Sequence, residues 1–123
     1  MTDPNPPGKP VGPYTPIVRA GGWLVVSGQL GLLDGRLVAG GLAGELAQAL
    51  KNLEAQLASE GASLADVVKT TVFLRHMSDY AQMNEVYVAA FGDHRPARSA
   101  VGVAELPLGA LVEVEAWACH EAG

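Results

Sequence analysis

Residues 67–91, VVKTTVFLRHMSDYAQMNEVYVAAF, decide the fold. The segment 67–75 is rich in β-branched residues, which predicts a strand. Alternation along this strand places Val68, Thr70, Val72 and Leu74 on one face. The segment 80–91 instead carries apolar side chains at helical spacing, and the Ser78-Asp79 pair before it is typical of a helix N-cap. The apolar stripe of this predicted helix comprises Tyr80, Met83, Tyr87, Ala90 and Phe91, and Gly92 is expected to end it.

The flanking sequence supplies a second helix and further strands. Residues 42–60 are predicted to be helical because leucines recur every three or four positions, and Gly61 is expected to stop the helix. Short apolar runs on either side of Gly21-Gly22 predict a hairpin, and Asp34-Gly35 predicts a second turn. Residues 97–104 and 111–119 are predicted to be strands joined by a hairpin loop over 105–110.

The order of these elements predicts an α+β fold with both helices on one face of the sheet. The last strand alternates strictly between two kinds of residue. We expect its small apolar face, formed by Val112, Val114, Ala116 and Ala118, to receive the helices. The second face of the sheet would then carry Leu111, Glu113, Glu115 and Trp117.

The distribution of proline predicts the domain organisation. Six of the eight prolines lie at or before position 16. Proline fixes φ and lacks a backbone donor, so residues 1–13 are interpreted as a Pro-rich extended arm. The remaining residues, 14–123, have a length that suits a single domain.

The charge composition argues against several classes of partner. A formal net charge of −5 disfavours a nucleic-acid-binding protein, which normally presents a basic face. The sequence lacks the long apolar run of a membrane span and the features of a signal peptide. From these two features we expect a cytoplasmic protein. Cys119 is the only cysteine, so no disulfide can form within the chain.

The low proportion of charged residues requires an explanation. Charged residues make up 17% of the chain, whereas a typical domain has about 25%. Either alanine and glycine cover much of the surface, or some apolar surface is hidden against another subunit. Composition alone leaves both alternatives open.

One arrangement of charged residues could carry chemistry in this sequence. No dinucleotide, phosphate-loop or zinc motif is present, and the three histidines lack the spacing of metal ligands, so no metal is expected. Arg98 precedes the small residues Ala100 and Gly102 along a predicted strand, and Glu113 and Glu115 share one face of its expected partner strand. We expect these charges on the second face of the sheet. They form either a solvated face with an ordinary ion pair, or an anion site in which a carboxylate holds water.

Several segments resemble the RidA family, also called the YjgF family. Residues 96–107, PARSAVGVAELP, resemble the signature of this family, and so do residues 112–116, VEVEA. The other matching segments, in order, are 12–14, 27–29, 68–73 and 83–87. The resemblance covers roughly residues 11–119, and it implies a homotrimer with a chorismate-mutase-like fold. In such a trimer the sheets face inward as a barrel-like core, and ligand clefts lie between subunits.

The resemblance also implies an activity and its residues. Active members hydrolyse reactive enamines or imines, such as 2-aminoacrylate and related 2-imino acids, to 2-keto acids and ammonia without a metal or organic cofactor. By this resemblance Arg98 binds the substrate carboxylate and Glu113 positions water. The other positions matched to the cleft are Tyr14, Ser27, Gly28, Asn84, Ser99 and Ala100. Many active members have cysteine where this chain has Ala100, and the loop over 92–95 is also shorter.

Two alternatives to a deaminase remain at this point. The same cleft could bind small molecules such as 2-keto acids without turnover, in a chaperone-like trimer. The endoribonuclease activity sometimes attached to this family is a third hypothesis, and the acidic net charge of −5 weighs against it.

Overall fold

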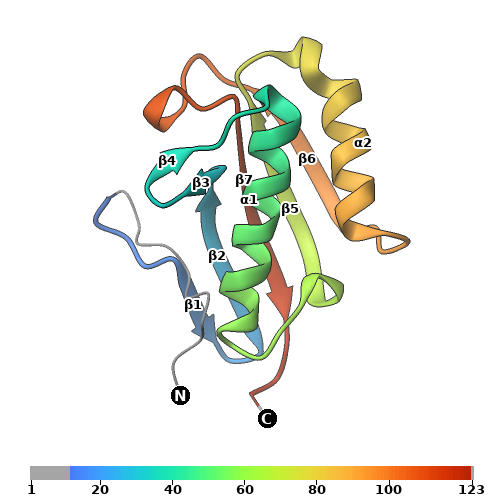
Figure 1. Ribbon diagram of the computed structural model, residues 1–123. Coiled ribbons are helices and arrows are strands. Elements are labelled where there is room, and N and C mark those ends of the chain that lie inside the picture. Colours follow the sequence, from blue (N-terminus) through green and yellow to red (C-terminus); the bar gives the residue numbers. More distant parts are fainter. Residues whose placement is uncertain (1–11, 123) are drawn as a thin grey trace.

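The computed structural model describes residues 12–122, in which one five-stranded sheet is covered on one face by two helices (Figure 1). The strand order is β1-β2-β7-β5-β6, and β3 and β4 form a separate small hairpin. The strands are β1 (Ile17–Ala20), β2 (Trp23–Gln29), β3 (Leu32–Leu33), β4 (Arg36–Leu37), β5 (Val67–Leu74), β6 (Ala97–Gly102) and β7 (Val112–Cys119). The helices are α1 (Gly41–Ala58) and α2 (Tyr80–Phe91). The predicted mixed fold, with two helices and a mostly antiparallel sheet, is confirmed.

The position of β6 corrects the predicted topology. β6 pairs with β5 in parallel, and β7 lies between β2 and β5. The predicted hairpin over 105–110 is therefore wrong, because the strands on either side of it are not neighbours. The physical reason lies in α2, which carries the chain back along the sheet after β5, so that the next strand runs parallel to it.

The core lies between the two helices and the sheet. The predicted leucine stripe of α1 is buried, and so is the small apolar face of β7. The stripe of α2 is buried at Met83, Tyr87 and Phe91, whereas Tyr80 is 40% exposed. One prediction for β5 is wrong: Val68 is 43% exposed, and Val67 is buried in its place. The pairing of β5 with β7 shifts between Val67 and Lys69, and this irregularity turns Val68 away from the helices.

The helix boundaries agree closely with the predicted ones. α1 runs from Gly41 to Ala58, and Ser59 forms its C-cap. α2 ends at Phe91, and Gly92 forms its C-cap with a φ of 64° that suits glycine. Asp79 occupies the N-cap position of α2, as predicted. Its side chain makes no capping hydrogen bond, so the expected capping interaction is wrong.

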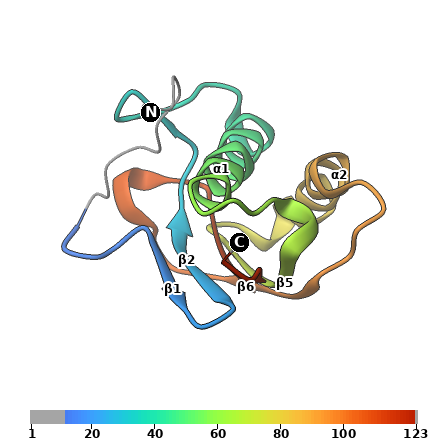
Figure 2. The same cartoon turned by 90° about the horizontal axis from the view of Figure 1, so that it is seen from below.

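The second face of the sheet carries large exposed side chains. Figure 2 shows α1 and α2 on the same side of the sheet, which leaves the other side open in the protomer. Trp23 and Trp117 meet there edge to face, with ring centroids 6.0 Å apart, and remain 43% and 44% exposed. Between residues 12 and 122, neither helix has the length and apolar character needed to cross a lipid bilayer. The predicted arm over 1–13 lies almost entirely outside the described residues.

Candidate functional site

Arg98 lies on the edge strand β6 and points toward the helix layer. Its in-register partner on β5 is Thr70, whose side chain is fully buried beneath α2. Paired residues of neighbouring strands project to the same face of a sheet. Arg98 therefore shares its face with α2.

Side chains from α2 hold the guanidinium of Arg98. Nη2 donates a hydrogen bond to the hydroxyl of Tyr80 at 3.0 Å, and Nη1 lies 3.5 Å from the sulfur of Met83. The guanidinium carbon lies 4.9 Å from the centre of the Tyr87 ring and 5.5 Å from that of Tyr80. Within residues 12–122, no Asp or Glu forms a salt bridge with Arg98. The guanidinium is thus positioned by neutral groups, which leaves its charge available to an anion.

The ring of Tyr87 lies beneath the guanidinium of Arg98 and is held by a buried hydrogen bond. Its hydroxyl and that of Thr70 share a buried hydrogen bond of 2.7 Å. Burial raises the pKa of Tyr87, while the Thr70 hydrogen bond and the charge of Arg98 oppose that rise. The phenol is therefore neutral at physiological pH, and the ring offers its face to the cation.

Two further predicted residues lie on the same side of the sheet as Arg98. Ala100 follows it by two positions on β6 and packs partly against the core. Asn84 lies one helical turn after Tyr80, on the same face of α2. Its side-chain oxygen is buried and accepts no hydrogen bond from the described part of the chain. Such a buried acceptor costs about 1–3 kcal/mol if it stays unsatisfied, so this position favours an incoming donor.

Glu113 lies on the opposite face of the sheet. It projects from β7 between the buried residues Val112 and Val114, away from the helices. Its carboxyl group lies against Gly28, where a Cβ atom would come within 2.7 Å of the carboxyl carbon. Desolvation by burial raises the pKa of Glu113, and the charge of Glu115 raises it further. A carboxyl group of this kind can take up a proton more readily than an exposed one.

A bulge in β2 brings other predicted residues to this second position. Pairing between β2 and β7 shifts between Val26 and Gln29, and Ser27 and Gly28 lie within that irregularity. The Ser27 hydroxyl donates to the Thr15 carbonyl at 2.7 Å, which ties the bulge to the segment that carries Tyr14. Tyr14 itself is 42% exposed. The glycine at position 28 leaves room for the Glu113 carboxyl group, which occupies the space that a side chain would fill.

Ser99 belongs to the open face as well. It pairs with Thr71 on β5, and its hydroxyl accepts a hydrogen bond from the ammonium group of Lys69 at 2.9 Å. Ser99 therefore points away from Arg98, although the two are adjacent in sequence.

The structure thus separates the predicted site residues into two groups. Arg98, Asn84 and Ala100 lie on the helix side, whereas Glu113 and the β2 bulge lie on the open side. The expectation that Arg98 and Glu113 share the second face is wrong, because β5 separates their strands and their side chains point to opposite faces.

Sequence reasoning also missed the partners of Arg98. Tyr80, Met83 and Tyr87 were recognised only as an apolar stripe of α2. Their spacing places all three on one face of a helix. The missing signal was the parallel pairing of β5 with β6, which brings that face over Arg98.

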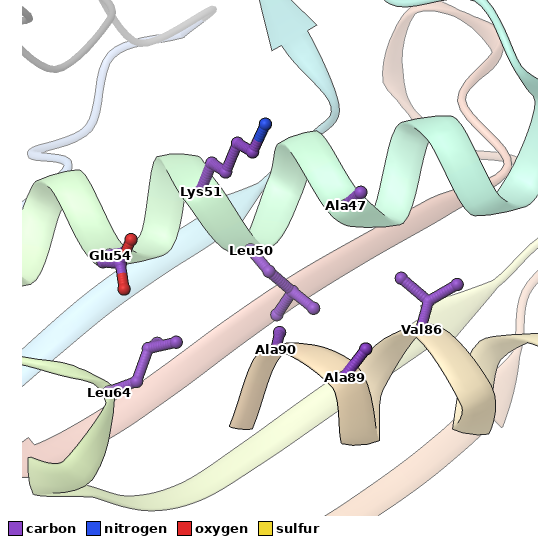
Figure 3. A pocket seen from close by; sticks show the side chains of 8 residues that line it. All are labelled: Ala47, Leu50, Lys51, Glu54, Leu64, Val86, Ala89 and Ala90. Carbon is purple, nitrogen blue, oxygen red and sulfur yellow. The ribbon is translucent and has the colours of Figure 1, made fainter. Parts of the chain in front are cut away.

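A groove elsewhere on the protomer lacks comparable chemistry. It lies between α1 and α2 and has a volume of about 300 Å³ (Figure 3). Apolar side chains line most of it, with Lys51 and Glu54 on the α1 side. None of the residues in the two groups above contributes to it. In the part of the chain that the structure describes, no three His, Cys, Asp or Glu side chains lie close enough to hold a metal ion.

These features define a small α+β protein whose edge-strand arginine and half-buried glutamate lie on opposite faces of one sheet. The family model described as Endoribonuclease L-PSP matches residues 5–120. The chain therefore belongs to the RidA/YjgF family, as the resemblance in its sequence indicated.

Relatives and solved structures cover nearly the whole chain. A RutC family protein of Pyrococcus horikoshii is 44% identical over 115 residues, which span 92% of this chain and 91% of that protein. A Mus musculus protein named 2-iminobutanoate/2-iminopropanoate deaminase is 46% identical over 108 residues, which span 86% of this chain and 80% of that protein. The structure of RidA from an Antarctic Psychrobacter matches with a TM-score of 0.88 and 40% identity, over 97% of this chain and 96% of that one.

Proposed function

We propose that the protein hydrolyses reactive enamines and imines, namely 2-aminoacrylate and related 2-imino acids, to 2-keto acids and ammonia. The observation that carries the proposal is the guanidinium of Arg98, which Tyr80, Met83 and Tyr87 hold and which no carboxylate among residues 12–122 pairs with. A planar arginine fork matches the carboxylate that every such substrate carries. The deaminase name of relatives at 40% to 46% identity supports the same reaction.

The proposed reaction consumes one water and releases ammonia. Arg98 holds the substrate carboxylate, and the enamine tautomer becomes the imine by taking a proton on carbon and losing one from nitrogen. Water then adds to the C=N carbon, and Glu113 accepts a proton from it and returns one to the nitrogen. The carbinolamine then collapses: its hydroxyl proton passes through Glu113 to the nitrogen, the C–O bond becomes C=O, and the C–N bond breaks, which leaves a keto acid and ammonia. Because an imine carbon is already electrophilic, positioning of the water supplies much of the rate.

We further propose that one site takes residues from two copies of the chain. Arg98, Asn84 and Ala100 would come from one protomer, and Glu113 with Tyr14, Ser27 and Gly28 from its neighbour. The opposite orientation of Arg98 and Glu113 supports this arrangement, because one protomer cannot present both to one small ligand. The exposed Trp23 and Trp117 support an assembly that covers the open face.

The assembly proposed is a homotrimer with a chorismate-mutase-like fold and inward-facing sheets that form a barrel-like core. It accounts for the low content of charged residues, 17%, since apolar sheet surface would be buried between subunits. It would also bury Ser99 and Lys69 near the interface. The expected cytoplasmic location is retained as part of the proposal.

Charge separates this function from RNA cleavage. The family description names an endoribonuclease. A chain with a formal net charge of −5 disfavours the binding of a polyanion. A single arginine next to aromatic rings suits one carboxylate better than a phosphate backbone. We therefore place the carboxylate substrate first.

The direct test is an amino-acid oxidase reaction in which ammonia release is followed with and without the protein. We expect the wild type to accelerate hydrolysis of the imine product. Arg98→Ala should lower kcat/KM by about 10–150-fold, the effect of losing a charged hydrogen-bonding partner. Arg36→Ala is the matched control, because Arg36 is exposed on the separate β3–β4 hairpin. Equal rates for the wild type and Arg98→Ala over several amino acids would refute the proposal.

A further inference from the structure

Arg98 donates a hydrogen bond to the hydroxyl of Tyr80. Among the described residues, this hydroxyl is the only side-chain oxygen that accepts a hydrogen bond from the guanidinium. We propose that this hydroxyl is a second hydrogen-bond donor to the ligand carboxylate, acting beside Arg98. The inference rests on the proposed function, because it assigns a further binding residue to the same site.

The direction of the existing hydrogen bond leaves the Tyr80 proton free. A guanidinium can only donate, so the Tyr80 oxygen accepts from Nη2 at 3.0 Å. A phenol carries one proton of its own, and no described residue accepts it from Tyr80. Because Tyr80 is 40% exposed, an incoming ligand can reach its hydroxyl and accept this proton.

The neutral surroundings of Arg98 favour such a donor pair. Met83 offers only a weak sulfur acceptor, and the rings of Tyr80 and Tyr87 offer their faces. No carboxylate of the described residues has to be displaced when a ligand arrives, so the guanidinium and the hydroxyl keep their positions. A hydrogen bond to an ionised carboxylate is roughly twice as strong as one between neutral groups.

The donor pair also predicts a preference among ligands. A carboxylate presents two acceptor oxygens and can accept from Arg98 and Tyr80 together. A carboxamide presents one oxygen and an NH₂ group, which would face a donor without an acceptor. The site should therefore discriminate against an amide more strongly with Tyr80 than without its hydroxyl.

The test compares wild type with Tyr80→Phe, which removes the hydroxyl and keeps the ring over Arg98. We expect calorimetry to show a Kd for 2-oxobutanoate raised about tenfold, the effect of one lost hydrogen bond to a charged group. KM should rise in parallel with kcat changed less than about threefold, because the hydroxyl acts on binding. The melting temperature should stay the same, since the hydroxyl is not needed for packing. Val88→Ala, on an exposed part of α2, is the control and should leave Kd unchanged.

Two further measurements decide between outcomes. With 2-oxobutanamide the wild type and Tyr80→Phe should bind equally weakly; an equal loss for both ligands would show that shape, not the donor, matters and would overturn the proposal. A double-mutant cycle with Arg98→Lys should show coupling, and additive losses would overturn it as well.

The remaining outcomes separate this proposal from the one on which it rests. If the wild type and Tyr80→Phe bind 2-oxobutanoate equally while Arg98→Ala does not bind it, the role of Tyr80 is refuted and the proposed function stands. If the wild type neither binds 2-oxobutanoate nor releases ammonia, both proposals fail.

Discussion

Glu113 shows at the scale of one residue how the fold sets a proton affinity. Its carboxyl group lies against Gly28 and next to Glu115, and burial is the larger cause of its raised pKa. The folded protein therefore binds a proton at Glu113 more tightly than the unfolded chain does. By linkage, the contribution of this residue to stability falls as pH rises from the ordinary glutamate pKa through the raised one.

The first prediction concerns Glu113→Gln, which keeps the shape and removes the charge. The melting temperature of this variant relative to wild type should be higher at pH 7 than at pH 4. The expected gain is a few degrees at most, because solvent screens a half-exposed carboxyl group. Thermal unfolding at the two pH values measures it, and a difference that does not change with pH would refute the assignment. Activity should fall at the same time, since the proposed proton acceptor is lost.

At the scale of elements, the β2 bulge positions Glu113 through a missing side chain. A Cβ atom at Gly28 would meet the flexible end of Glu113, whereas one at Gly31 would meet the backbone of Glu45 at 2.4 Å. The two glycines therefore have different roles. The first leaves space for the Glu113 carboxyl group, and the second allows β3 and α1 to approach.

The second prediction follows from this difference. Gly28→Ala should displace the Glu113 carboxyl and lower kcat/KM by about 10–100-fold, because small misplacements of a reacting group are costly. Its stability should change little. Gly31→Ala is the contrasting variant and should cost about 1–3 kcal/mol of stability through overpacking. Denaturant unfolding and the ammonia assay measure both variants, and the reverse pattern would contradict this account.

The third prediction concerns the contact that docks α2 on β5. Thr70 and Tyr87 share a buried hydrogen bond of 2.7 Å beneath Arg98. Thr70→Val should cost about 1–3 kcal/mol of unfolding free energy, because the Tyr87 hydroxyl is left buried without a partner. The double variant Thr70→Val, Tyr87→Phe should recover part of that loss. Additive losses in a denaturant-based cycle would show that the hydroxyls do not act as a pair.

The sequence predicted the helices and strands better than it predicted which strands pair with each other. The leucine periodicity of α1 and the strict alternation of β7 report on burial, which local pattern encodes directly. The pairing of β6 with β5 depends on the path of the chain through α2, and a hairpin was wrongly expected instead. That one error placed Arg98 on the wrong face, since the face of a strand depends on its partner as well as on its own alternation.

The residues of the candidate site were identified without their arrangement. The family resemblance pointed to Arg98 and Glu113. No local sequence pattern indicates that their side chains lie on opposite faces of the sheet. Tyr80 and Tyr87 were classed with the core because aromatic side chains at helical spacing are typical of a buried stripe. Their contact with Arg98 depends on tertiary structure, which brings β6 beneath α2.

At the scale of the whole molecule, we propose that burial of the open face between subunits explains the low content of charged residues. Trp23 and Trp117 are large, adjacent and exposed in the protomer. The fourth prediction is that wild type is a trimer at micromolar concentration by light scattering, and that Trp117→Lys dissociates to smaller species. Wild type that remains monomeric, or a Trp117→Lys variant that remains trimeric, would contradict burial of this face.

The shared site is the central claim, and subunit complementation tests it most directly. Arg98→Ala and Glu113→Gln are each expected to retain only a small fraction of wild-type activity as pure trimers. After denaturation and refolding of a one-to-one mixture, every mixed trimer would contain one site with both residues intact. Ammonia release should then recover to about a quarter of the wild-type rate, since three in four random trimers are mixed and each has one of three sites. A mixture that stays as low in activity as the two variants alone would show that Arg98 and Glu113 do not act across a subunit boundary.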